Sequence, residues 1–150
     1  MGDIRQKEGF EFPAYSFAVE RGKIREFVQA IGDPNPLYVN KDVAVGEGYQ
    51  DVIAPPTFGV CIDMWGGPGF EKLCADLEIN PVKVLHGEQE FEYLGEINPG
   101  DLLTGKTRVD NVFRKEGKSG AMNFINLRTT YHNQRNEKVL VAKMLIVERA

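Results

Sequence analysis

The stretch AIGDPNPLYVNKDVA, residues 30–44, holds a side chain that could do proton chemistry, Asp33, in a stiff setting. Gly32 is typical of a helix end, and Pro34 and Pro36 restrict the backbone that follows. A carboxylate in such a rigid loop can be aimed at a substrate or a water molecule. An aspartate before a proline is also a common turn or cap residue, so both interpretations stay open.

Two further groups could exchange protons. Tyr38 follows Asp33 in the same loop, but a phenol titrates near pH 10, about three units above neutrality, and is a weak base at pH 7. His86 lies in LHGEQEFEY, residues 85–93, whose alternation predicts a β-strand. The alternation places Leu85, Gln89, Phe91 and Tyr93 on one face and His86, Glu88, Glu90 and Glu92 on the other. We expect the face with His86 to be exposed or at an interface.

Asp63 is the one charged residue in the apolar stretch APPTFGVCIDMWGG, residues 54–67. A buried carboxylate needs a partner, and a structural salt bridge or cap is the expected one. The two cysteines, Cys61 and Cys74, lie in apolar segments and are expected to be reduced thiols in the core. Histidine and cysteine spacing indicates neither a metal site nor a cofactor site.

The elements that would position these groups follow from periodicity. Apolar residues at helical spacing predict a helix over 19–32, and a short helix is expected over 40–48. A third, apolar helix within 54–67 should be buried on most sides. Strands are expected at 15–19 and in four antiparallel runs at 85–93, 101–113, 121–133 and 138–149. Helices early and strands late favour an α+β fold, with an apolar helix against an antiparallel sheet.

Composition limits the function classes. The 150 residues suit one domain, residues 1–150, and the net charge of −4 comes without a run of lysine or arginine. Nucleic acid is therefore not an expected partner. The longest apolar run is too short and too broken to span a membrane. The charged start of the sequence does not resemble a signal peptide, and we expect a cytoplasmic protein.

The order of three stretches resembles the MaoC-like hot dog hydratase and dehydratase family. These stretches are GDPNPLY followed by NKDVA, GYQDVIAPPTFGV, and HGEQEFEYLGEINPGD. The resemblance implies a hot dog fold, in which a curled antiparallel sheet of about five strands wraps a central helix, here TFGVCIDMW. More narrowly, APPTF and HGEQEFEY resemble the non-catalytic hot dog unit. That unit forms the N-terminal half of two-hot-dog enzymes, the FAS1-type dehydratase region, or the acyl-binding subunit of mycobacterial (3R)-hydroxyacyl carrier-protein dehydratases.

Active members of that family add water to an enoyl thioester or remove it, with an aspartate and a histidine in an Asp-x-x-x-x-His loop. The resemblance places Asp33 at the aspartate position and Asn35 at the loop asparagine, but Tyr38 stands where the histidine belongs. A second departure lies at the head of the central helix. Active members have His-Gly there, whereas this chain has Ala54-Pro55, and proline has no backbone N–H to stabilise an oxyanion.

The resemblance therefore gives two groups of candidate residues. The candidates for catalysis are Asp33, Tyr38 and His86. The candidates for contact with an acyl thioester are Asn35, Pro55, Pro56, Thr57, Phe58 and Trp65.

Three functions remain open. In the first, the chain is a subunit of an (R)-specific enoyl-thioester hydratase or 3-hydroxyacyl-thioester dehydratase of fatty acid metabolism. It binds the acyl chain while a second hot dog chain supplies Asp and His. In the second, it is a self-sufficient homodimeric enoyl-CoA hydratase that uses Asp33 with Tyr38 or His86. In the third, it is a non-catalytic module for binding acyl thioesters. The expected ligand in each is an acyl thioester of coenzyme A or of acyl carrier protein. Each also implies a dimer, because pairing covers an exposed sheet edge.

Overall fold

The computed structural model describes residues 3–118 and 120–149. Five strands form one antiparallel sheet in the order β1-β3-β4-β5-β2. The strands are β1 (Tyr15–Ala18), β2 (Val84–Tyr93), β3 (Leu102–Gly117), β4 (Gly120–His132) and β5 (Lys138–Arg149). The helices are α1 (Arg21–Ile31), α2 (Lys41–Gly46), α3 (Gly59–Gly66) and α4 (Phe70–Leu77), and Ile4–Lys7, Pro36–Tyr38 and Pro81–Lys83 form short 3-10 helices.

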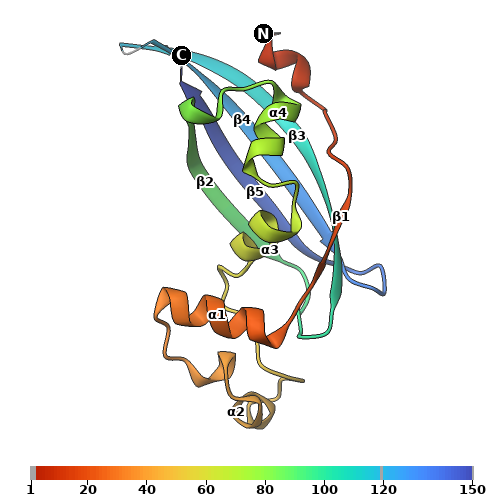
Figure 1. Ribbon diagram of the computed structural model, residues 1–150. Coiled ribbons are helices and arrows are strands. Elements are labelled where there is room, and N and C mark those ends of the chain that lie inside the picture. Colours follow the sequence, from red (N-terminus) through yellow and green to blue (C-terminus); the bar gives the residue numbers. More distant parts are fainter. Residues whose placement is uncertain (1–2, 119, 150) are drawn as a thin grey trace.

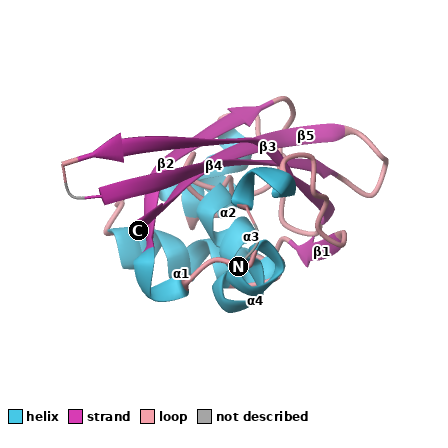
Figure 2. Ribbon diagram, turned by 90° about the horizontal axis from the view of Figure 1, so that it is seen from above, coloured by secondary structure: helices cyan, strands magenta, loops and turns pink. Residues whose placement is uncertain are grey.

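The helices gather on one side of the sheet, as the view from above shows (Figure 2). Helices α3 and α4 lie along the sheet, while α1 and α2 sit beyond one of its ends (Figure 1). The long strands β3, β4 and β5 form the middle of the sheet and pair over most of their length. The α+β class and the number of strands agree with the sequence prediction, and the sheet is curled but not closed.

Helix α1 forms where the apolar stripe predicts it. Ile24 and Val28 are buried in the core, Phe27 packs against it, and Ile31 at the last turn is exposed. The helix ends at Gly32, whose φ of 69° is left-handed and whose N–H caps the carbonyls of the last turn. The loop that carries Asp33 therefore starts from a fixed helix end.

Helix α3 is shorter and less buried than expected. A turn closed by the Phe58 N–H and the Pro55 carbonyl, 2.9 Å apart, precedes its first residue, Gly59. A side chain at Gly59 would lie within 2.5 Å of the Phe91 ring, so the missing Cβ lets α3 approach β2. Met64 and Trp65 are 65% and 76% exposed. The prediction of burial on most sides holds for Gly59–Asp63 and is wrong for Met64 and Trp65 near the end of the helix.

Helix α4 is an element that we did not predict. It carries Cys74 and Leu77 into a second core cluster, where they meet Val109 of β3 and Ile125 of β4. Cys61 of α3 is buried in the first cluster, so both thiols lie in the core as expected.

Strand β2 pairs only with β5 and therefore forms an edge of the sheet. A β-bulge at Gly87 separates His86, which faces Ile146, from Glu88, which faces Leu145. Paired residues share a face, so His86 lies on the same side as Gln89 and the helices. The prediction that His86 shares the face of the glutamates is wrong, because the extra residue at the bulge shifts the alternation by one.

Candidate functional site

Asp33 organises its own loop. Its Oδ1 accepts a hydrogen bond from the Asn35 N–H at 3.0 Å, and Asn35 in turn uses Oδ1 to accept one from the Leu37 N–H at 3.1 Å. These two bonds begin the 3-10 helix Pro36–Tyr38. The role of a turn residue is thus seen directly for Asp33, which is half-buried.

Tyr38 points into the protein. Its side chain is 8% exposed and belongs to the first core cluster, which also contains Val28 and Phe58. The neighbouring Leu37 carbonyl accepts the Ile53 N–H at 3.1 Å, which ties the Asp33 loop to the segment that leads into α3. The loop is held in place, and the Tyr38 ring packs among apolar side chains of the first core cluster.

The head of α3 carries most of the predicted acyl-binding residues. Pro55 is buried, whereas Pro56 and Thr57 are exposed. The Pro56 carbonyl accepts a hydrogen bond from the Tyr93 hydroxyl at 2.7 Å. Phe58 is 1% exposed, and its ring packs edge-on against the rings of Phe17 and Phe27.

Trp65 lies farther along α3 and points away from the sheet. The ammonium group of Lys23 in α1 stands 5.6 Å from the centre of its ring. The structure therefore does not bring the six predicted contact residues into one pocket. Pro55 and Phe58 are part of the core, and Trp65 belongs to the outer surface.

A hydrogen-bonded network of titratable and amide side chains lies under α3. The Asp63 carboxylate accepts hydrogen bonds from the Tyr131 hydroxyl and, at 3.3 Å, from Gln89 Nε2. The hydroxyl groups of Tyr131 and Tyr15 are 2.6 Å apart. Gln89 Oε1 lies 3.1 Å from His86 Nε2. The network joins α3 to strands β1, β2 and β4.

Burial governs the ionisation of this network. It raises the pKa of Asp63 from 3.8 to about 6, although the bonds from Tyr131 and Gln89 act in the opposite direction. Burial also raises the pKa of Tyr15 to about 12 and that of Tyr131 far above its ordinary value. Within residues 3–118 and 120–149, the ion pairs involve carboxylates other than that of Asp63. The prediction of a salt bridge for Asp63 is therefore wrong. A hydroxyl and an amide stabilise it instead.

The candidate catalytic residues thus fall into two places. Asp33 and Tyr38 lie at the α1 end of the first core, and His86 belongs to the Asp63 network. Sequence reasoning noticed Asp63 as a lone charge and placed Gln89 on the face of β2 opposite the glutamates. It missed Tyr15 and Tyr131, whose phenols meet only because β1 and β4 flank β3.

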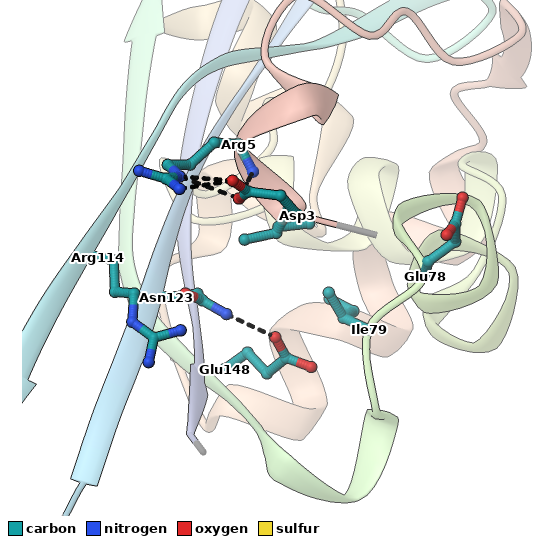
Figure 3. A pocket seen from close by; sticks show the side chains of 8 residues that line it. Asp3, Arg5, Glu78, Ile79, Arg114, Asn123 and Glu148 are labelled. Atoms are coloured by element: carbon teal, nitrogen blue, oxygen red, sulfur yellow. Dashed lines mark hydrogen bonds and ion pairs between the residues drawn. The ribbon is translucent and has the colours of Figure 1, made fainter. Parts of the chain in front are cut away.

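Two hollows lie away from these residues. The first, about 500 Å³, is walled by the N-terminal 3-10 helix, the end of α4 and strands β3 to β5 (Figure 3). Its charges are paired: Arg5 with Asp3 at 2.6 Å, and Glu148 with the Asn123 amide at 3.0 Å. The second, about 540 Å³, opens beside β3 and β4. Neither is lined by a predicted site residue.

Comparison with known proteins decides the family. Residues 6–142 match the family described as "FAS1-like, dehydratase domain region". The chain belongs to this family. It is 35% identical over 138 residues to a "UPF0336 protein" of Streptomyces avermitilis, which covers 92% of this chain and 89% of that protein. A "UPF0336 protein" of Thermobifida fusca is 34% identical and covers 93% of this chain and 88% of its own length.

Solved structures with the same arrangement of the chain confirm the hot dog fold. The truncated HadBC (3R-hydroxyacyl-ACP dehydratase) complex of Mycobacterium tuberculosis has a chain with a TM-score of 0.80 and 21% identity, and the match covers 97% of this chain and 98% of that one. A chain of the ChsH1–ChsH2 complex of the same organism has a TM-score of 0.78 and 22% identity, and the match covers 97% of this chain and 86% of that one. The R-hydratase PhaJ1 of Pseudomonas aeruginosa has a TM-score of 0.63 and 16% identity, and the match covers 95% of this chain and 81% of that one.

None of the described helices is long and apolar enough to cross a membrane.

Proposed function

We propose that this chain is the acyl-binding subunit of an (R)-specific enoyl-thioester hydratase or 3-hydroxyacyl-thioester dehydratase. In this proposal a second hot dog chain supplies the aspartate and histidine. The observation that carries it is the burial of Tyr38 at the position where active members have histidine. One carboxylate oxygen of Asp33 accepts a hydrogen bond from the Asn35 N–H within the same loop. An acid–base pair that handles one water molecule needs two groups at the substrate, and this loop offers at most one.

The exposed side of α3 and the free edge of β2 support a partner chain. Met64 and Trp65 project from α3, and Leu85 on β2 is 48% exposed. Large exposed apolar side chains beside the free edge of a sheet are typical of a protein interface. Two of the solved structures with this fold, HadBC and ChsH1–ChsH2, are described as complexes.

The head of α3 supplies the proposed acyl wall. Proline at positions 55 and 56 removes two N–H donors, so the first N–H after them belongs to Thr57. Thr57 and Pro56 are exposed, while Phe58 and Pro55 form the apolar layer behind them. Asn35 fixes the adjacent loop through the Leu37 N–H. We assign this surface to the acyl chain of a thioester of coenzyme A or acyl carrier protein, and we assign the acid–base chemistry to the partner.

Hydration of a short trans-enoyl-CoA tests the proposal through the loss of enoyl absorbance. The purified chain is assayed alone and together with a second hot dog chain that carries an Asp-x-x-x-x-His loop. We expect turnover only with the partner, and we expect Asp33→Asn in this chain to leave that turnover within about threefold, because a hydrogen-bonding group at this position preserves the turn. Loss of turnover with Asp33→Asn would refute the division of labour.

A self-sufficient homodimer is the second candidate, and the observation that favours it is the link between His86 and the Asp63 network. It predicts turnover by the chain alone that His86→Asn abolishes. If neither the chain alone nor the complex turns over an enoyl or 3-hydroxyacyl thioester while the chain still binds an acyl-CoA, the binding module is the remaining function.

A further inference from the structure

The side-chain amide of Gln89 is held by two acceptors on the same side. Its Nε2 lies 3.3 Å from Asp63 Oδ2 and 3.2 Å from the main-chain carbonyl oxygen of Lys143. An amide NH2 group has two hydrogens, so one can point to each acceptor. Both donors of Gln89 are therefore used within α3 and β5.

The Lys143 carbonyl fixes which way this amide faces. A carbonyl oxygen can only accept a hydrogen bond, whatever the pH, so the amide nitrogen of Gln89 must face it. A flipped amide would set its own oxygen against that carbonyl and against the Asp63 carboxylate. Protonation of Asp63 could relieve only the second contact. The oxygen Oε1 of Gln89 consequently points the other way, toward His86.

The orientation of Gln89 assigns the proton on His86. Oε1 lies 3.1 Å from His86 Nε2 and can only accept, so Nε2 must carry the hydrogen. A neutral imidazole has one N–H, which leaves Nδ1 as an acceptor with its lone pair free. His86 is exposed, and in the described part of the chain its one hydrogen bond is the bond to Gln89.

We infer that Gln89 is a positioning residue, which holds His86 with Nε2–H inward and presents Nδ1 at the β2 edge as the acceptor for an O–H or N–H group of the ligand. The assignment of the proton stands on the contacts alone. The assignment of a ligand rests on the proposed function, in which the partner chain that supplies the acid–base pair docks on the free edge of β2. Water, the 3-hydroxyl group of the substrate and the amides of a pantetheine arm all offer such a donor.

The first test reads the tautomer directly, without substrate. Long-range 1H–15N correlation spectra of the 15N-labelled full chain at pH 8 show which imidazole nitrogen carries the hydrogen, and His86→Asn separates its signals from those of His132. We expect the Nε2–H form alone in the wild type and a mixture of both tautomers in Gln89→Leu. Gln89→Met serves as a second variant of similar length should Gln89→Leu fail to fold.

Two controls sharpen this test. Gln29→Leu makes the same substitution on the exposed side of α1 and should leave the His86 signals unchanged. Asp63→Asn should also keep the Nε2–H form, because the Lys143 carbonyl still fixes the amide. A mixture of tautomers in the wild type, an Nδ1–H form, or a Gln89→Leu spectrum identical to that of the wild type would overturn the inference.

The ligand contact has its own readout in the partner complex. Gln89→Leu and His86→Asn should each lower kcat for the enoyl thioester at least tenfold, with a smaller change in KM. Wild-type kcat in both variants, together with the expected tautomers, would limit Gln89 to a structural role and overturn the ligand contact. A complex without any turnover refutes the proposed function but leaves the tautomer result as it stands.

Discussion

At the scale of single residues, Asp63 makes the stability of the protein depend on pH. Burial raises its pKa to about 6, whereas the unfolded chain should show a value near 3.8. The folded state therefore binds this proton more readily than the unfolded state does. The contribution of this bound proton to the free energy of unfolding is complete below pH 4 and is lost as the pH rises through about 6.

Asp63→Asn removes this dependence, since asparagine does not ionise and its side-chain oxygen can still accept the Tyr131 hydrogen. We expect the free energy of unfolding of the variant, relative to the wild type, to increase by up to about 3 kcal/mol between pH 4 and pH 8. Urea unfolding at several pH values measures this difference. A difference that stays constant with pH would show that Asp63 is already ionised at pH 4 in the folded chain.

Tyr38 provides a second prediction at this scale. Its ring is buried in the first core, and within residues 3–118 and 120–149 its hydroxyl group makes no hydrogen bond. Tyr38→Phe should therefore change the free energy of unfolding by less than about 1 kcal/mol and should leave turnover of the partner complex unchanged. Steady-state kinetics and chemical unfolding check both expectations. A tenfold loss of kcat in a folded variant would restore the phenol as a catalytic group.

The sequence could indicate which residues matter more easily than what they contact. Asp63 stood out as a charge in an apolar helix, but its partners come from strands far away in the chain, so their types could not be read from its neighbours. His86 was a candidate, yet its face was assigned wrongly because simple alternation has no place for a bulge. Gly87 was the one local signal, since glycine inside a strand often marks such a site.

At the scale of elements, close packing around Gly105 supports the tyrosine network. A Cβ at Gly105 of β3 would lie 2.7 Å from atoms of both Tyr15 and Tyr131, whose hydroxyl groups are bonded to each other. Gly105→Ala should lower the free energy of unfolding by about 1–3 kcal/mol, because two restrained rings must move. Thermal or urea unfolding measures the loss.

Gly22→Ala is the matched control for this substitution. A Cβ at Gly22 meets no atom within 4 Å, and the residue lies in the first turn of α1. We expect this variant to be as stable as the wild type or up to about 1 kcal/mol more stable. Equal losses in both variants would mean that the packing around Gly105 has no special role.

Periodicity predicted most elements but not all of them. The strands and the two helices α1 and α2 followed from apolar spacing and turn residues. Helix α4 was missed although Phe70, Leu73, Cys74 and Leu77 have helical spacing after Pro68-Gly69. The length of α3 was overestimated, because Pro55 and Pro56 precede a turn rather than open the helix.

At the scale of the whole molecule, the exposed side of α3 should control association. Trp65 is 76% exposed, and the ammonium group of Lys23 lies over its ring, so we expect the fold to tolerate its replacement. Trp65→Glu should keep the circular dichroism spectrum and raise the dissociation constant for a second hot dog chain at least tenfold, since buried tryptophans often dominate interfaces. Analytical ultracentrifugation measures the association.

Val45→Glu provides a comparison on another exposed part of the surface. Val45 lies on α2 and is 49% exposed, and α2 sits beyond the end of the sheet (Figure 1). We expect the Val45→Glu variant to bind the second hot dog chain with the dissociation constant of the wild type. A weakening as large as that of Trp65→Glu would place the interface on α2 instead.

The bulge in β2 also bears on how this strand can change in length. On the two sides of Gly87, His86 faces Ile146 on the helix side and Glu88 faces Leu145 on the opposite side. Neighbouring residues of a regular strand alternate in the same way. A single-residue deletion at Gly87 would thus straighten the strand and keep every other side chain on its present face. A deletion within Gln89–Glu92 would instead turn part of the strand over. When related sequences are aligned with this one, a one-residue gap in β2 belongs at Gly87.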